Sequence, residues 1–131
     1  MRIVLDTNVL LAAFATRGLC EALLAGCLEA HEIVTSRYIL EELQGHLAGK
    51  FGMPARFARD LVTFLREQSD LVEPSDVPIA ACRDPADAPV LGTAVSGRAD
   101  LLVTGDADLL VLRRYAGILI VTPRQCYDRM R

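Results

Sequence analysis

The sequence predicts an α/β protein whose mainly parallel sheet is sandwiched between layers of helices. Short apolar runs rich in β-branched residues alternate along the chain with longer segments of helical periodicity. Hydrophobic residues make up 52% of the 131 residues, which is enough to form a core. No repeat, linker or low-complexity tract interrupts this alternation, so residues 1–131 are expected to form one domain.

The first half of the chain is expected to contain two strands and four helices. Apolar residues predict buried strands at 3–5 and 33–35, and helical spacing predicts helices within 9–15, 19–30, 39–47 and 54–65. Ser36 is expected to cap the third helix. Pro54 suits the first turn of the fourth helix, whose buried face is predicted to contain Phe57, Leu61, Phe64 and Leu65.

The second half begins with an edge strand at 71–73 and a loop at 74–78. A helix is then expected, with Asp84 as its cap, Pro85 in its first position and Gly97 as its stop. Strands follow at 101–104 and 118–121, separated by a brief helix at 109–112. The final helix is predicted to start at a capping box formed by Thr122, Pro123 and Gln125.

Composition excludes several classes of protein. The net charge of −3 provides no global basic field for nucleic acid, which leaves a local patch or a metal in an acidic pocket. The longest apolar run, residues 9–15, is much shorter than the roughly 20 residues of a membrane helix. The four cysteines are scattered without a C-x-x-C pair and are expected to be reduced thiols. These features predict a cytoplasmic protein without a membrane segment.

Four acidic residues occupy positions that predict a shared site. Asp6 and Asp106 follow predicted strands, Glu42 lies on a helix, and Asp87 lies in the first turn of another helix. Ligands of open α/β sheets bind at the carboxyl ends of the strands, so Asp6 and Asp106 are expected to meet there. Gathered carboxylates are costly unless a cation neutralises them, and an all-oxygen set favours Mg²⁺ or Mn²⁺ over Zn²⁺.

Several acids also have a purely structural interpretation, which fits Asp6 and Asp106 least well, because a charge that closes a buried strand needs a partner. Asp84 and Asp108 are both in positions to cap helices. Asp87 is also explained as a favourable charge near a helix N-terminus. Periodicity only slightly favours Glu42 over Glu41 as the inward-facing residue.

Several polar residues accompany the acids. Thr7, Asn8 and Thr104 lie beside the strand ends, where they either orient carboxylates or cap the adjoining backbone. His31 and His46 lie far from the acidic strand ends in sequence and match no triad pattern, which favours a surface or structural role.

Four segments together resemble the PIN domain, and most closely the toxin-type PIN-domain proteins of bacteria and archaea. They are I-V-L-D-T-N-V-L-L at 3–11, I-L-E-E-L at 39–43, R-D-P-A-D at 83–87 and L-L-V-T-G-D-A-D-L-L at 101–110. The resemblance implies a Rossmann-like α/β/α fold and a ribonuclease that uses Mg²⁺ or Mn²⁺. It also implies a cognate antitoxin and a homodimer, because many members have them.

Carried over by motif, the resemblance assigns metal binding and catalysis to Asp6, Glu42, Asp87 and Asp106. Asp108 matches an additional acid of some members, and Asp84 fits the D-P-x-D pattern of this branch. Asn8 and Thr104 match supporting polar positions. The helix after Asp87 contains Pro89 and Gly92, which are expected to loosen it.

The function expected from these residues is hydrolysis of RNA phosphodiester bonds, as the toxin of a toxin–antitoxin pair. The alternative is a non-catalytic PIN-like module that binds RNA or protein. A phosphatase of the haloacid dehalogenase type is disfavoured because Asn8 stands where it needs a second Asp, and because Lys50 is the only lysine. The same absence of a late lysine disfavours a receiver domain. Arginines are candidates for RNA contact, namely Arg17, Arg37, Arg56, Arg59, Arg113 and Arg114.

Overall fold

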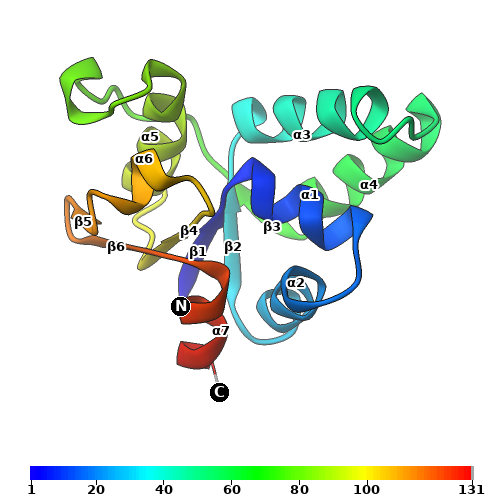
Figure 1. Cartoon of the computed structure of the whole chain (residues 1–131), viewed down its shortest axis with the longest axis horizontal. Coiled ribbons are helices and arrows are strands. Elements are labelled where there is room, and N and C mark those ends of the chain that lie inside the picture. The colour runs from blue at the N-terminus through cyan, green and yellow to red at the C-terminus, as the bar shows by residue number, and fades with distance from the viewer. Residues whose placement is uncertain (131) are drawn as a thin grey trace.

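The computed structural model of the chain describes residues 1–130 and contains one six-stranded sheet with the order β3-β2-β1-β4-β6-β5. All neighbouring strands are parallel except β5, which pairs antiparallel with β6. Helix α5 packs against β1, β2 and β4. Helix α2 contacts β2, α7 contacts β4 and β6, and these two helices contact each other (Figure 1). The predicted α/β/α architecture with a mainly parallel sheet is confirmed.

The strands are short and the helices are of ordinary length. The strands are β1 (Arg2–Leu5), β2 (Glu32–Thr35), β3 (Ser69–Leu71), β4 (Leu101–Val103), β5 (Arg114–Tyr115) and β6 (Ile118–Val121). The helices are α1 (Thr7–Ala15), α2 (Leu19–Ala30), α3 (Arg37–Gly49), α4 (Ala55–Glu67), α5 (Ala88–Ser96), α6 (Ala107–Leu110) and α7 (Pro123–Met130), with 3₁₀ turns η1 (Ile79–Ala81) and η2 (Pro85–Asp87). Across residues 1–130, no single helix is long and apolar enough to cross a bilayer. Helices α1 and α2 together have sufficient length and apolar character, but the pair is bent by 104°.

Two predicted helix caps are present. The Ser36 hydroxyl accepts a hydrogen bond from the Ile39 N–H at 3.5 Å, at the start of α3. At the start of α7, the Thr122 hydroxyl accepts from the Gln125 N–H at 3.1 Å, and Gln125 Oε1 accepts from the Thr122 N–H at 2.9 Å. These reciprocal bonds form the expected capping box.

The predicted buried face of α4 is wrong for its aromatic residues. Phe57 and Phe64 are 52% and 45% exposed, while Ala58, Val62 and Leu65 are buried. The aromatic row and the row of Ala58, Val62 and Leu65 both have helical spacing. Helix α4 buries the second row, which has the smaller side chains, and packs against α3. Pro54 also differs from expectation, because it lies at the cap position just before α4 and not inside its first turn.

The expectation that Pro89 and Gly92 loosen their helix is also wrong. Helix α5 is continuous, and Pro89 lies in its first turn, where a backbone N–H is not needed. Gly92 packs against the loop before η1: the Ser75 N–H donates to the Gly92 carbonyl at 3.0 Å. A Cβ at position 92 would lie 2.2 Å from the Ser75 carbonyl oxygen, so the close approach requires glycine.

The cysteines are reduced throughout the part of the chain that the structure describes. Cys27, Cys82 and Cys126 are buried, and Cys20 is partly buried. Burial raises the pKa of the Cys27 thiol to about 12 and that of Cys126 to about 11. Such thiols carry little thiolate near neutral pH and behave as small apolar core residues.

Candidate metal centre

The carboxyl ends of β1 and β4 bring two of the predicted acids to the same edge of the sheet. Leu5 pairs with Val103, and the Asp6 N–H donates to the Val103 carbonyl at 2.9 Å. Asp6 caps α1, where its Oδ1 accepts from the Thr7 N–H at 2.7 Å. Asp106 caps α6, where its Oδ1 accepts from the Asp108 N–H at 2.9 Å. Both carboxylates are therefore anchored at strand–helix junctions.

The hydroxyl of Thr104 links these two junctions. It donates to Asp6 Oδ2 at 2.7 Å and accepts from the Asp106 N–H at 3.0 Å. Asn8 adds a second link, because its Oδ1 accepts from the Gly105 N–H at 3.2 Å. Thr104 is completely buried, so its orientation is fixed by packing as well as by these bonds.

Glu42 reaches the site from α3. Its Oε1 accepts a hydrogen bond from the Thr7 hydroxyl at 2.5 Å. Glu41 instead lines a separate groove between α3 and α4, together with Arg37 and Arg66. The structure therefore directs Glu42, and not Glu41, toward Asp6.

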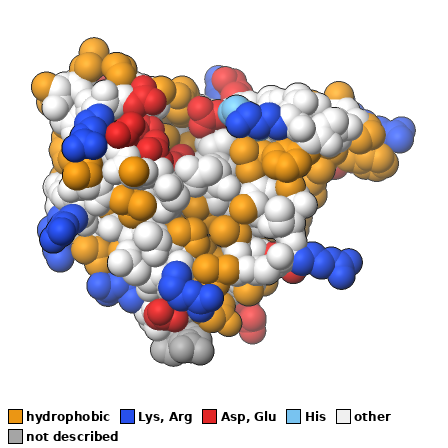
Figure 2. All heavy atoms as spheres, in the orientation of Figure 1, with side chains coloured by type: hydrophobic (Ala, Val, Ile, Leu, Met, Phe, Trp, Pro, Cys, Tyr) orange, Lys and Arg blue, Asp and Glu red, His pale blue; other side chains and the backbone are white. Residues whose placement is uncertain are grey.

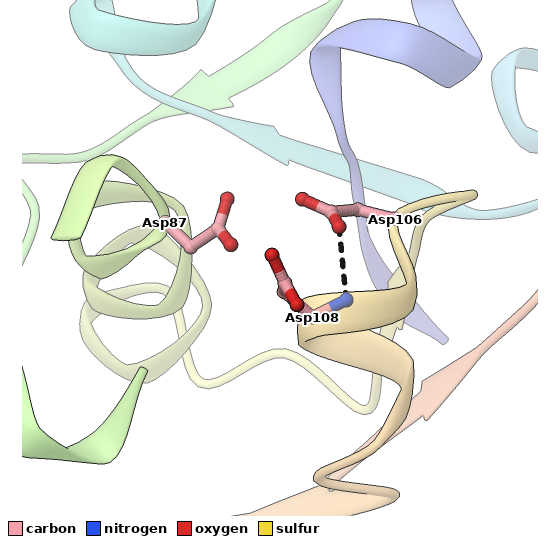
Figure 3. A group of neighbouring side chains, drawn as sticks. All are labelled: Asp87, Asp106 and Asp108. Carbon is pink, nitrogen blue, oxygen red and sulfur yellow. Dashed lines mark hydrogen bonds between the residues drawn. The ribbon is translucent and has the colours of Figure 1, made fainter. Parts of the chain in front are cut away.

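Asp84 and Asp87 come from the segment before α5 and have different surroundings. Asp84 is exposed and caps η2, with its Oδ1 accepting from the Ala86 N–H at 3.0 Å. Asp87 is only 8% exposed. Figure 3 shows the Asp87 carboxylate facing those of Asp106 and Asp108, and one oxygen from each of the three lies within 4.8 Å of the others.

Asp108 has two other interactions besides this cluster. Its backbone N–H donates to Asp106 Oδ1 at 2.9 Å, the dashed line in Figure 3. Its side chain lies 3.8 Å from the guanidinium of Arg83; the Arg83 side chain is 67% exposed and that of Asp108 is 41% exposed. The prediction that Asp108 caps this helix is therefore wrong: the cap of α6 is Asp106, and Asp108 lies in the first turn.

Five of these acids line a pocket of about 460 Å³, which we call the acidic pocket, whereas Asp108 is not part of its lining. In Figure 2 acidic side chains gather on the upper part of the molecule, between the α5–α6 side and α3. The ionisable residues that line the pocket are Asp6, Glu42, Asp84, Asp87, Asp106, His46 and Lys50. Within residues 1–130, none of the arginines predicted to contact RNA lines it.

Sequence reasoning missed His46 and Lys50. His46 was expected to be a surface or structural residue, yet it lies in the acidic pocket with Lys50. The signal was present in the spacing, because the two residues follow Glu42 at intervals of four along α3.

The electrostatics of the pocket disfavour several ionised carboxylates without a counter-charge. Burial, followed by the charges of Asp106 and Asp6, raises the pKa of Asp87 to about 7. Burial also raises the pKa of Asp6, and its hydrogen bonds with Thr104 and Thr7 partly offset that rise. Proximity and burial both act against the charged forms.

The donor set fits a hard divalent cation. Among the described residues, Asp87 Oδ2 is buried and has no hydrogen-bond partner. An unpartnered carboxylate oxygen beside other carboxylates is costly unless a cation binds it. All candidate donors are carboxylate oxygens, which suit Mg²⁺ or Mn²⁺.

The architecture and the acidic pocket define a class of α/β protein with carboxylates at the carboxyl edge of its sheet. The PIN domain profile matches residues 2–108, so the chain belongs to the PIN-domain family. No curated protein sequence matches the chain.

Three solved structures share the fold at low sequence identity. VapBC2 from Rickettsia felis, bound to a DNA fragment from its promoter, superimposes with a TM-score of 0.65 at 14% identity, covering 93% of this chain and 98% of that one. VapBC-1 from nontypeable Haemophilus influenzae superimposes with a TM-score of 0.63 at 17% sequence identity, and the match covers 95% of this chain and 99% of that one. FitAcB from Neisseria gonorrhoeae superimposes with a TM-score of 0.58 at 19% sequence identity, and the match covers 93% of this chain and 98% of that one.

Proposed function

We propose that this PIN-domain protein is a metal-dependent endoribonuclease that hydrolyses RNA phosphodiester bonds. The supporting observation is that Asp6, Glu42, Asp87 and Asp106, from four separate segments, line one pocket. The buried and unpartnered Asp87 Oδ2 adds to this support, because it needs a cation nearby.

Asp6, Glu42, Asp87 and Asp106 would hold Mg²⁺ or Mn²⁺, directly or through water. A bound divalent ion supplies an activated water and stabilises the charge that develops on the phosphate. The remaining requirement is that the carboxylates keep their positions while RNA enters and leaves. No side chain of the protein is needed as a nucleophile.

The chain's own hydrogen bonds provide that positioning. Thr104 orients Asp6 from one side, and the Thr7 N–H holds its other oxygen. The Thr7 hydroxyl fixes Glu42, so α1 and α3 are joined at the pocket. Preorganised donors of this kind avoid reorganisation at the moment of reaction.

A cleavage assay with single-stranded RNA tests the proposal. We expect cleavage with Mg²⁺ or Mn²⁺, its loss in EDTA and its recovery when the ion is restored. Asp6→Asn and Asp106→Asn are expected to abolish cleavage while leaving the protein folded. Asp60→Asn, which removes one exposed carboxylate on α4, is the matched control and should cleave normally.

Two results would contradict the ribonuclease. Cleavage that persists in chelator would exclude the metal mechanism. A folded wild-type protein that binds RNA but never cleaves it, with either ion, would favour a non-catalytic PIN-like module instead.

We propose further that the ribonuclease is the toxin of a toxin–antitoxin pair, with a cognate antitoxin and a homodimeric assembly. The resemblance to toxin-type PIN proteins and the fold shared with the VapBC structures support this assignment. Expression in a bacterial host should arrest growth for the wild type and not for Asp106→Asn. Equal growth of both strains would contradict a toxin role.

A further inference from the structure

Two positively charged or protonatable side chains share the acidic pocket with the carboxylates. His46 and Lys50 both line it, together with Glu42. The three residues are spaced by four along α3, and Lys50 keeps helical backbone angles directly after its end. They therefore lie in one row on one face of the helix. In Figure 2 a histidine and a basic side chain lie beside acidic side chains on the same face of the molecule.

The fold itself makes no use of these two side chains. Across residues 1–130, neither the His46 ring nor the Lys50 ammonium has a hydrogen-bond or ion-pair partner. Glu42, four residues before His46, is bonded to Thr7. The row is therefore not explained as a chain of ion pairs along a solvated helix.

We propose that His46 and Lys50 form a phosphate-binding track, which leads a single strand of RNA along α3 into the acidic pocket. The track rests on the proposed ribonuclease function and extends it to substrate binding. Four residues of an α-helix advance by about 6 Å. This advance is comparable with the spacing of successive phosphates on an extended strand. His46 would thus contact the phosphate next to the scissile one, and Lys50 the following phosphate.

The chemistry of the two side chains suits this task. The Lys50 ammonium offers three hydrogen-bond donors, and the His46 ring offers at least one N–H in either protonation state. Contacts to phosphate position a strand without reading its sequence. The protein has a net charge of −3 and five acids around the pocket, so basic groups beside the metal site would help to hold an anionic strand there.

A different role for the same positions makes a different prediction. Positive charge near the carboxyl end of a helix stabilises the helix dipole, and His46 and Lys50 lie at that end of α3. If that were their purpose, their removal would lower thermal stability and leave RNA binding unchanged. The salt dependence of RNA binding separates the two roles, because each phosphate contact contributes to it.

The test measures binding of a fluorescein-labelled 12-nucleotide single-stranded RNA of random sequence by fluorescence anisotropy. Ca²⁺ serves as the divalent ion, and the NaCl concentration is varied. Lys50→Gln should weaken binding at least about threefold and reduce the slope of log affinity against log salt by about 0.7. Lys50→Arg should restore both values. His46→Gln should weaken binding, and Arg124→Gln on α7, which removes one exposed charge far from α3, should bind as the wild type does.

Cleavage assays with Mg²⁺ on the same variants keep the two proposals distinguishable. A wild type that cleaves RNA, with Lys50→Gln and His46→Gln matching it in affinity and salt slope, would overturn the track and leave the ribonuclease standing. A wild type that binds RNA without cleaving it would overturn the ribonuclease, while a reduced slope in Lys50→Gln would still support the track. Failure of the wild type to bind RNA would overturn both.

Discussion

The Thr104 hydroxyl lies 2.7 Å from Asp6 Oδ2 and donates a hydrogen bond to it across the junction of β4 and β1. The same hydroxyl accepts from the Asp106 N–H, so one buried group sets the positions of two candidate ligands. Thr104→Val preserves the shape of the side chain and removes both bonds. We expect this variant to lose about 10- to 100-fold in Mn²⁺ affinity, the usual effect of deleting a group that orients metal ligands.

Isothermal titration calorimetry with Mn²⁺ measures this loss, and circular dichroism verifies the fold. Thr104→Ser keeps the hydroxyl and should bind Mn²⁺ within a few-fold of the wild type. Equal affinity of Thr104→Val and the wild type would show that the hydroxyl does not position the ligands.

The raised pKa of Asp87 predicts how the stability of the metal-free protein depends on pH. Its carboxyl has a pKa of about 7 in the folded chain, compared with an ordinary value of 3.8. Between these values the folded protein keeps a proton that the unfolded chain has released. The bound proton therefore stabilises the folded state relative to the unfolded chain. This stabilisation is complete below about pH 4 and is lost as the pH rises through 7.

Each pKa unit corresponds to about 1.4 kcal/mol, so the free energy of unfolding should fall by an amount on the order of a few kcal/mol over this range. Urea denaturation in EDTA from pH 4 to pH 8 measures it. Asp87→Asn should flatten the profile and make the metal-free protein more stable than the wild type at pH 8. Asp60→Asn on α4 should keep the wild-type slope, and an unchanged slope in Asp87→Asn would contradict the assignment.

The parts of the fold that could be predicted from sequence are those with local causes. The strand at 3–5 and the helix at 19–30 follow from the spacing of apolar residues, and the caps at Ser36 and Thr122 follow from side chains that bond within their own turn. Strand β5 escaped prediction because it has two residues, and its hairpin depends on positive φ angles at Ala116 and Gly117.

Only one part of the candidate site could be predicted from sequence, namely the part that follows from the meeting of strand ends at one edge of a parallel sheet. The convergence of Asp6 and Asp106 follows from that rule. The choice of Glu42 over Glu41 depends on the bond from Thr7, which forms when α1 packs against α3. The burial of Asp87 and the placement of His46 likewise depend on contacts between distant segments, which periodicity does not encode.

The orientation of α4 predicts unequal effects for two adjacent substitutions. Leu65 is completely buried, whereas the neighbouring Phe64 is 45% exposed. Leu65→Ala should lower the free energy of unfolding by about 2–5 kcal/mol, because it leaves a cavity. Phe64→Gln should change it by no more than about 0.5 kcal/mol. Urea denaturation of both variants checks this, and a larger loss for Phe64→Gln would mean that the aromatic stripe is covered in solution.

Two glycines in helices predict stability changes of opposite sign. A Cβ on Gly92 in α5 would lie 2.2 Å from the backbone oxygen of Ser75, and the Pro74 side chain is also near. Gly92→Ala must therefore move the loop or break its bond to α5, at a cost of about 1–3 kcal/mol. Gly45, exposed in the middle of α3, has nothing within 4 Å of its Cβ position. Gly45→Ala should therefore stabilise the protein by up to about 1 kcal/mol, the difference in helix propensity. Thermal unfolding of the two variants decides the matter: a Gly92→Ala melting temperature equal to or above that of the wild type would show that α5 and the 74–78 loop do not need this close contact.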